Sequence, residues 1–214
     1  GPRVPTSLTD PDRDCPFCPR LAEFRSEARA REPGWFNAPV PSFGGADASL
    51  LIVGLAPGLQ GANRTGRPFT GDYAGDLLYA TLHQTGFANQ LRSVASDDGL
   101  RLRGAWISAT AHCAPPDNKP LPEESARCRP FLERELDAFG VGTPRLRLRA
   151  VVALGKIAFD AYLGILFERG KQRFSAVHTQ GAEHVALAAR DHGSRLDQLV
   201  NHVSRLPGPG GEGI

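Results

Sequence analysis

Three short apolar runs along the chain are typical of buried β-strands. They cover residues 49–54, 105–109 and 149–154. The first run ends at a Gly/Pro break, and the third ends at Gly155. Runs that are apolar on both faces predict strands that are covered by helices on both sides of a parallel sheet.

Helical patterns alternate with these runs. The predicted helices cover residues 21–31, 75–85, 122–139 and 157–167. Gly86 supplies a C-terminal stop for the second of them. The alternation predicts an α/β layered domain with a mostly parallel sheet, in which ligands bind at the carboxyl ends of the strands.

The length of 214 residues fits one such domain. We assign residues 1–14 to an extended arm, 15–206 to a single domain, and 207–214 to a flexible tail rich in Pro and Gly. The start at Gly1-Pro2 is interpreted as a processed or tagged end rather than a secretory signal. The chain has no uninterrupted apolar stretch of about 18 residues. We therefore expect a cytoplasmic protein with no membrane contact.

Charge gives little information about partners. The net charge is only +2, although 22 of the 25 cationic residues are Arg and 3 are Lys. Arg suits bidentate recognition of phosphate, but the same bias follows from a GC-rich genome. Residues 145–149 alternate Arg with Leu, which predicts a solvated strand face rather than a DNA contact.

The four cysteines form two pairs that are far apart in the sequence. Cys15 and Cys18 form a C-x2-C pair near the start, whereas Cys113 and Cys128 lie in the second half of the chain. Without a secretory signal, a metal site is favoured over disulfides, and C-x2-C rarely arises from packing needs alone. Four thiolates suit zinc or a four-iron cluster, and the spacing alone does not choose between them.

The segment that follows the first strand is long and dense in glycine. It runs over residues 54–72 and contains two arginines, Phe69 and Asp72. It matches neither the G-K-[ST] phosphate loop nor G-x-G-x-x-G. A functional loop that approaches a ligand with its backbone is one interpretation. The alternative is an ordered surface loop in which Phe69 is a hydrophobic plug and Asp72 caps the next helix.

Taken together, these motifs resemble the iron–sulfur uracil-DNA glycosylases, and in particular the family 5 (type B) enzymes. The resemblance rests on GLAPGLQGANRTGRPFTGDYAG, on the upstream C-x2-C pair and on CAPPDNKP at 113–120, and it extends over residues 15–184. It implies a three-layer fold with a central four-stranded parallel sheet flanked by helices. It also implies a structural [4Fe–4S] cluster as the cofactor, with the ligands Cys15, Cys18, Cys113 and Cys128.

The resemblance also implies roles in a pocket for a flipped uracil. Phe69 is expected to stack beneath the base, and the backbone of Leu55 and Ala56, with Gly58 allowing close approach, to bind the base edge. Asn118 is expected to pair with the amide edge of the base. Asp72 is expected to stabilise the sugar cation or to position the attacking water.

A late histidine is expected to stabilise the departing base. We favour His202 over His192, because the segment at 181–184 precedes the catalytic His of the family by a similar distance. Family members continue with an Asn-Thr stretch, whereas His202-Val203-Ser204-Arg205 is followed here by Leu206-Pro207. The departure concerns the loop that enters DNA.

The expected partner is uracil-containing DNA, bound by a prokaryotic monomer. The expected DNA contacts are Arg64, Arg67, Lys119 and Arg205. Ala109 stands where family 4 relatives carry a base-reading Asn, which implies a range that includes hypoxanthine and other deaminated or damaged bases. No lysine stands at a Schiff-base position, so a monofunctional glycosylase is expected. Two alternatives remain: a module that binds uracil or abasic DNA with weak or no turnover, and a zinc-stabilised nucleotide hydrolase.

Overall fold

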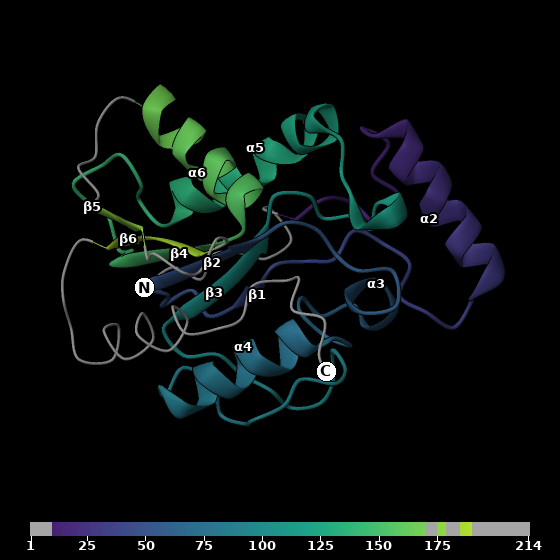
Figure 1. Cartoon of the computed structure of the whole chain (residues 1–214), viewed down its shortest axis with the longest axis horizontal. Coiled ribbons are helices and arrows are strands. Elements are labelled where there is room, and N and C mark those ends of the chain that lie inside the picture. Colours follow the sequence, from purple (N-terminus) through teal and green to yellow (C-terminus); the bar gives the residue numbers. More distant parts are fainter. Residues whose placement is uncertain (1–9, 170–174, 179–184, 190–214) are drawn as a thin grey trace.

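The computed structural model describes residues 10–169, 175–178 and 185–189. In this part of the chain, six strands form one sheet at the centre of the molecule (Figure 1). In spatial order they are β1 (Phe43–Gly44), β3 (Ala105–Ala109), β2 (Leu50–Gly54), β4 (Ala150–Leu154), β6 (Val185–Ala189) and β5 (Ser175–His178).

The three predicted strands form the parallel part of this sheet. β2 lies between β3 and β4 and runs parallel to both. The α/β class is therefore confirmed, whereas the described sheet is larger than the expected four parallel strands. β1 is antiparallel to β3, and β6 is antiparallel to both β4 and β5. β1 has only two residues, and β5 and β6 are consecutive antiparallel neighbours that need no crossover helix between them, so the alternation of strands and helices does not reveal these strands.

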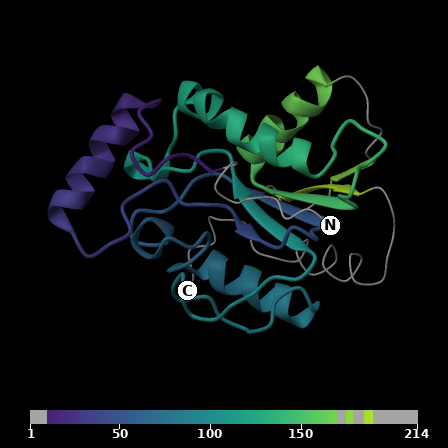
Figure 2. The same cartoon turned by 180° about the vertical axis from the view of Figure 1, so that it is seen from behind.

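Helices cover both faces of the sheet (Figures 1 and 2). The described helices are α2 (Pro19–Arg31), α3 (Ala62–Thr65), α4 (Tyr73–Gln84), α5 (Pro122–Ala138) and α6 (Lys156–Glu168). α4 packs on one face, where its leucines join a buried cluster with Ile52 and Ile107. α5 and α6 pack on the other face around Trp106. The four predicted helices are confirmed to within two residues at each end.

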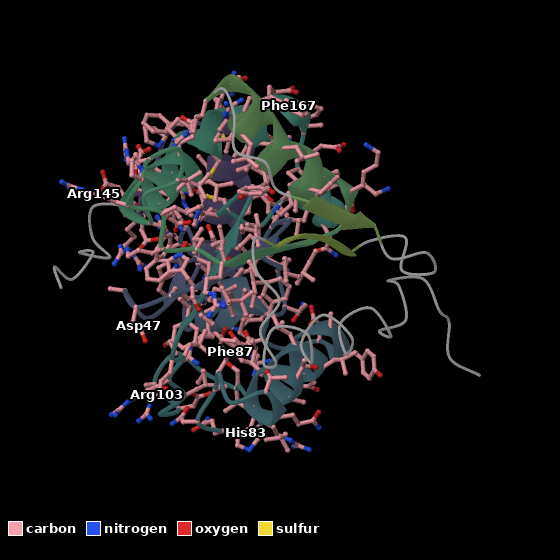
Figure 3. All side chains as sticks on the ribbon, turned by 90° about the vertical axis from the view of Figure 1, so that its left-hand side faces the viewer. Asp47, His83, Phe87, Arg103, Arg145 and Phe167 are labelled. Carbon is pink, nitrogen blue, oxygen red and sulfur yellow. The ribbon has the colours of Figure 1, made fainter. Side chains whose placement is uncertain are left out.

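The surface carries most of the charged side chains (Figure 3). Arg145, Arg147 and Arg149 are exposed, whereas Leu148 between them is buried. Arg147 donates to the carbonyl oxygens of Ala46 and Ala138. These residues are therefore solvated as predicted, but they lie in the loop that leads into β4 and not in a strand, so the predicted strand face is wrong. In the described part of the chain, no helix is long and apolar enough to cross a membrane.

Candidate functional site

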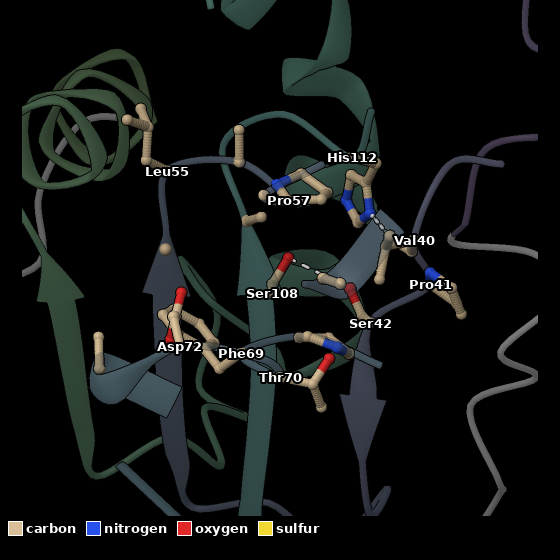
Figure 4. Close-up of a pocket in the computed structure, with 17 residues that line it drawn as sticks. Val40, Pro41, Ser42, Leu55, Pro57, Phe69, Thr70, Asp72, Ser108 and His112 are labelled. Carbon is tan, nitrogen blue, oxygen red and sulfur yellow. Dashed lines mark hydrogen bonds between the residues drawn. The ribbon is translucent and has the colours of Figure 1, made fainter. Parts of the chain in front are cut away.

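A pocket opens where β2 and β3 end, which is the edge at which parallel sheets bind ligands (Figure 4). Two walls form it. The first, which we call the loop wall, comes from residues 62–74, and the second, the hydroxyl wall, comes from residues 40–42, Ser108 and His112.

Phe69 is a main part of the loop wall, and its ring lies very close to the backbone of Gly54. Its φ is 55°, a left-handed conformation that bulky residues rarely adopt. A Cβ atom built on Gly54 would lie only 2.5 Å from Cζ of Phe69, so the ring rests directly on the end of β2. Below it, the Tyr79 hydroxyl donates to the carbonyl oxygen of Pro68 at 2.7 Å. Glycine at position 54 is therefore required for this ring placement.

Asp72 lines the same wall and also caps α4. Its Oδ1 accepts a hydrogen bond from the Gly75 N–H at 2.7 Å. Its Oδ2 makes no hydrogen bond to another described residue, and the side chain is exposed toward the pocket. Capping and a role in the pocket are thus compatible, because each uses a different oxygen.

The backbone after β2 forms the floor between the walls. Leu55, Ala56 and Gly58 all line the pocket. The Leu55 carbonyl oxygen accepts from the Ala111 N–H at 2.9 Å, which ties this floor to the extension of β3.

Asn118 lies at the rim beside this floor. It ends a short 3-10 helix, η1 (Pro116–Asn118), and both Asp117 and Asn118 have positive φ values, 54° and 55°. Its Oδ1 is 3.9 Å from the position that a Cβ on Gly58 would take. Asn118 therefore lies next to the floor at Gly58, but it does not line the pocket with Phe69 and Asp72. His202, His192 and Arg205 lie outside the described residues.

The hydroxyl wall contains residues that the motifs did not reveal. Ser42 and Ser108 present neighbouring hydroxyls, 3.3 Å apart between their oxygens. His112 is buried, and its Nδ1 donates to the Val40 carbonyl oxygen at 2.7 Å. Burial lowers the pKa of His112, which keeps the ring neutral. The only available signal in the sequence was Ser108, a polar residue within an otherwise apolar run.

The predicted DNA-contacting cations divide into two groups. Arg64 and Lys119 are exposed near the pocket. Arg67 is only 4% exposed, stacks on Phe43 with 4.0 Å to the ring centroid, and pairs with Asp98 at 3.3 Å. A buried and paired guanidinium cannot reach a phosphate, so Arg67 is removed from the set of candidate DNA contacts.

The four cysteines line one cavity, although they come from opposite ends of the sequence. Burial and the nearby thiols raise the pKa of Cys113 to about 11 and that of Cys128 to about 12. Arg25 lies beside them, donating to Cys113 Sγ at 3.5 Å and to the Cys15 carbonyl oxygen at 3.0 Å. In chemical type, four thiols beside a buried cation suit a thiolate-ligated metal group, because such a group carries negative charge and suppresses thiol protonation. Among the described residues, however, no three His, Cys, Asp or Glu side chains are arranged so that they could hold a metal ion.

Comparisons with known proteins show which family the chain resembles over most of its length. The family model described as "Uracil DNA glycosylase superfamily" matches residues 41–201. A Type-5 uracil-DNA glycosylase of Thermus thermophilus is 46% identical over 155 residues, which cover 70% of this chain and 67% of that protein. A Type-5 enzyme of Mycobacterium tuberculosis is 40% identical over 200 residues, covering 89% and 72%. A Type-4 enzyme of Archaeoglobus fulgidus is 34% identical over 120 residues, covering 56% and 49%.

Proposed function

This chain belongs to the uracil DNA glycosylase superfamily, and we propose that it excises uracil from DNA by hydrolysing the N-glycosidic bond, which leaves an abasic site. One observation carries the proposal: a single pocket joins Phe69, the Leu55–Ala56 backbone and Asp72. An aromatic face, a polar backbone edge and a carboxylate are the groups that base excision requires.

The pocket acts first by holding the base. A base inside a duplex is out of reach, so the nucleotide must rotate out of the stack. The Phe69 ring then supplies a stacking face, and the floor at Leu55 and Ala56 supplies backbone groups for the base edge. The Asn118 amide, which offers both a donor and an acceptor, supports the same edge from the rim.

The chemistry follows from where Asp72 lies. The bond between C1′ and the base nitrogen breaks with its electron pair passing to the base, while positive charge develops on the sugar. Water adds to C1′ and releases a proton, and the base finally takes up a proton. Oδ2 of Asp72 stabilises the sugar cation or orients that water. We assign the hydrogen bond to the departing base to His202, with His192 as the alternative.

Asp72→Asn gives the sharpest test of this role. Asn retains the helix cap but removes the negative charge, so fold and chemistry are separated. We expect uracil release from duplex DNA to fall at least about a hundredfold, the scale of a lost carboxylate in acid–base or electrostatic catalysis. Asp76→Asn, at an exposed position in the first turn of α4, is the control. Retained activity in Asp72→Asn, with normal folding, would sink the role given to this residue.

We propose that Cys15, Cys18, Cys113 and Cys128 hold a [4Fe–4S] cluster. The shared cavity and the buried Arg25 beside it support this proposal. When bound, the cluster supplies structure by tying the N-terminal segment to the start of α5. The same four residues could hold zinc, so the metal must be identified chemically.

Metal analysis and absorption spectroscopy distinguish the two groups. We expect about four irons and four sulfides per chain, as for such a cluster, together with a brown colour and broad absorption at the violet end of the visible spectrum. Cys128→Ser should lower both the iron content and the melting temperature. A colourless protein with one zinc per chain would contradict the assignment.

We also propose a second substrate and a set of DNA contacts outside the pocket. Ala109 lines the pocket with a small apolar side chain, so we include hypoxanthine as a substrate.

We propose Arg64, Lys119 and Arg205 as phosphate contacts of a monomer on DNA. If the protein binds uracil-containing DNA tightly in a gel-shift assay and releases no base, a binding module replaces the glycosylase.

A further inference from the structure

Two serines of the hydroxyl wall and a glutamate behind them form a buried chain of hydrogen-bonding groups. Ser108 on β3 is 1% exposed, Ser42 is 6% exposed, and Glu135 on α5 is 1% exposed. The Ser42 hydroxyl contacts Ser108 Oγ at 3.3 Å and makes a short hydrogen bond with Glu135 Oε1. Figure 4 shows the first of these contacts at the pocket, between two of its lining residues. Glu135 itself does not line the pocket.

The number of hydrogens in this chain restricts its arrangements. A serine hydroxyl has one hydrogen, so Ser42 cannot donate to Glu135 and to Ser108 at the same time. If Glu135 is ionised, both serine hydrogens turn toward the carboxylate, and Ser108 presents only lone pairs to the pocket. If Glu135 is protonated, it donates to Ser42, and Ser42 donates to Ser108. The hydrogen of Ser108 is then free to point into the pocket.

The surroundings of Glu135 favour the second arrangement up to neutral pH. Burial and the nearby carboxyl of Asp10 together raise the pKa of Glu135 to about 7, although hydrogen bonds from Ser108, Ser42 and Trp106 lower it. Asp10 approaches from the N-terminal segment, where its Oδ1 accepts from the Ser42 N–H at 2.9 Å. Burial also raises the pKa of Asp10, to about 6. Glu135 Oε2 makes no hydrogen bond to another described residue, which further disfavours the charged form.

We propose that Ser108 is a specificity-determining residue that donates a hydrogen bond to a carbonyl oxygen of the flipped base, and that Glu135 is a positioning residue that sets this donor through Ser42. The proposal rests on the proposed function and deepens it. Uracil carries a carbonyl group where cytosine carries an amino group. If a fixed donor faced the amino group of cytosine, both donors would lack an acceptor. The three hydrogen-bonded groups therefore select against cytosine.

Thio-substituted substrates test the contact with Ser108. Sulfur is a weak acceptor, so DNA that contains 2-thiouracil or 4-thiouracil weakens a hydrogen bond to one carbonyl position at a time. The rate ratio of uracil to thiouracil release is measured under single turnover in the wild type, Ser108→Ala and Ser49→Ala. Ser49 is the matched control, because it precedes β2 at the opposite end of that strand from the pocket.

The expected result is specific to one carbonyl. For the 4-thio substrate, the ratio falls about three- to tenfold in Ser108→Ala, the worth of one neutral hydrogen bond, and is unchanged in Ser49→Ala. Differences in leaving-group reactivity cancel, because the same substrates are compared across variants. A 4-thio ratio that stays at the wild-type value in Ser108→Ala, including the case in which only the 2-thio ratio changes, would overturn the proposal, because cytosine shares the 2-carbonyl with uracil.

The pH dependence of that ratio tests the role of Glu135. In the wild type the ratio should decline as pH rises through about 7, where Glu135 loses its proton. Glu135→Gln keeps an amide N–H that can donate to Ser42, so its ratio should stay level over the same range. Ser42→Ala interrupts the hydrogen-bonded chain and should also abolish the pH dependence of the ratio. If Ser108→Ala does not fold, this variant tests whether Glu135 acts on the pocket through Ser42. An unchanged pH profile in both variants would overturn the positioning role.

Binding measurements keep this inference separate from the proposed function. Duplexes with 2′-fluoro-deoxyuridine and its thio analogues resist cleavage, so affinity ratios can be measured even if the protein releases no base. If the affinity ratio depends on Ser108, the inference holds whether or not excision occurs. If excision occurs while neither the rate ratio nor the affinity ratio depends on Ser108, the inference fails and the glycosylase function stands.

Discussion

The two walls of the pocket are built on different physical principles. The loop wall is one continuous segment whose shape depends on close backbone approach: Phe69 rests on Gly54, and the Phe69 carbonyl oxygen faces Gly75. The hydroxyl wall assembles residues that are distant in sequence, and a buried hydrogen-bonded chain that ends at Glu135 orders its hydroxyls.

This difference determines which kind of change disrupts each wall. The close approach of Phe69 leaves no space for an added carbon at Gly54 or Gly75. The hydroxyl wall depends instead on the position of one proton. Steric substitutions should therefore break the first wall, and titration should alter the second.

The largest effect is expected from Gly75→Ala. A Cβ at this position would lie 2.1 Å from the Phe69 carbonyl oxygen, which is backbone and cannot rotate away. We expect a loss of about 3 kcal/mol in unfolding free energy, the scale of a steric insertion into a packed core, together with displacement of Phe69 and loss of excision. Chemical denaturation gives the first value and uracil release the second.

Gly164→Ala is the matched control for this prediction. Gly164 also lies within a helix, but a Cβ there would meet nothing within 4 Å. Helix propensity alone should then stabilise the protein by about 0.5–1 kcal/mol. Equal effects of the two substitutions would show that steric contact with Phe69 does not shape the loop wall.

A similar effect on stability is expected from Arg67→Ala, which removes the clamp behind the loop wall. Arg67 and Asp98 are 4% and 6% exposed, and Arg67 also donates to the Ser96 carbonyl oxygen at 2.9 Å. Removal of one partner leaves a buried charge unpaired and should destabilise the protein by about 3 kcal/mol. DNA affinity measured below the unfolding transition should change little, because Arg67 does not reach solvent.

Lys156→Ala provides the contrast, because Lys156 and Asp160 form an ion pair that is 78% and 53% exposed. This pair should contribute less than about 0.5 kcal/mol. A large drop in DNA affinity with unchanged stability in Arg67→Ala would restore its predicted role as a DNA contact.

The smallest effect concerns the hydroxyl wall and depends on pH. The pKa of Glu135 is raised from 4.5 to about 7 in the folded protein, so between these values the folded state holds a proton that the unfolded state has lost. The contribution of Glu135 to stability is therefore present at low pH and declines as pH rises from about 4.5 to 7. Glu135→Gln removes this decline.

Unfolding free energies at pH 5 and pH 7 check this prediction. The decrease between the two should be smaller in Glu135→Gln than in the wild type. Glu123→Gln, an exposed position of the same helix, should retain the wild-type decrease. Parallel curves for the wild type and Glu135→Gln would contradict the buried neutral acid.

The contrast between the walls also explains what could be predicted from the sequence. The parallel strands and four helices follow from local periodicity, and the loop wall follows from a contiguous motif that contains both Phe69 and Asp72. The motif did not reveal that Phe69 has a positive φ, nor that Arg67 turns inward to Asp98, since both depend on tertiary contacts.

Sequence patterns alone could not predict that the residues of the hydroxyl wall lie together. Ser42, Ser108 and Glu135 lie on three different segments, and no local spacing connects them. Glu135 shares the apolar face of α5 with Phe131, Leu132 and Leu136, so only its residue type, and not its position in the helix, would assign it to solvent. Only the packing of α5 against β3 places its carboxyl beside the two serines.

The most direct test of the account is a crystal structure of Asp72→Asn bound to a duplex that contains deoxyuridine. The account predicts a flipped uracil whose ring stacks on Phe69, with the side chain at position 72 near C1′ and a base carbonyl oxygen about 3 Å from Ser108 Oγ. A uracil that remains stacked in the duplex, or one bound away from the pocket between the two walls, would contradict it.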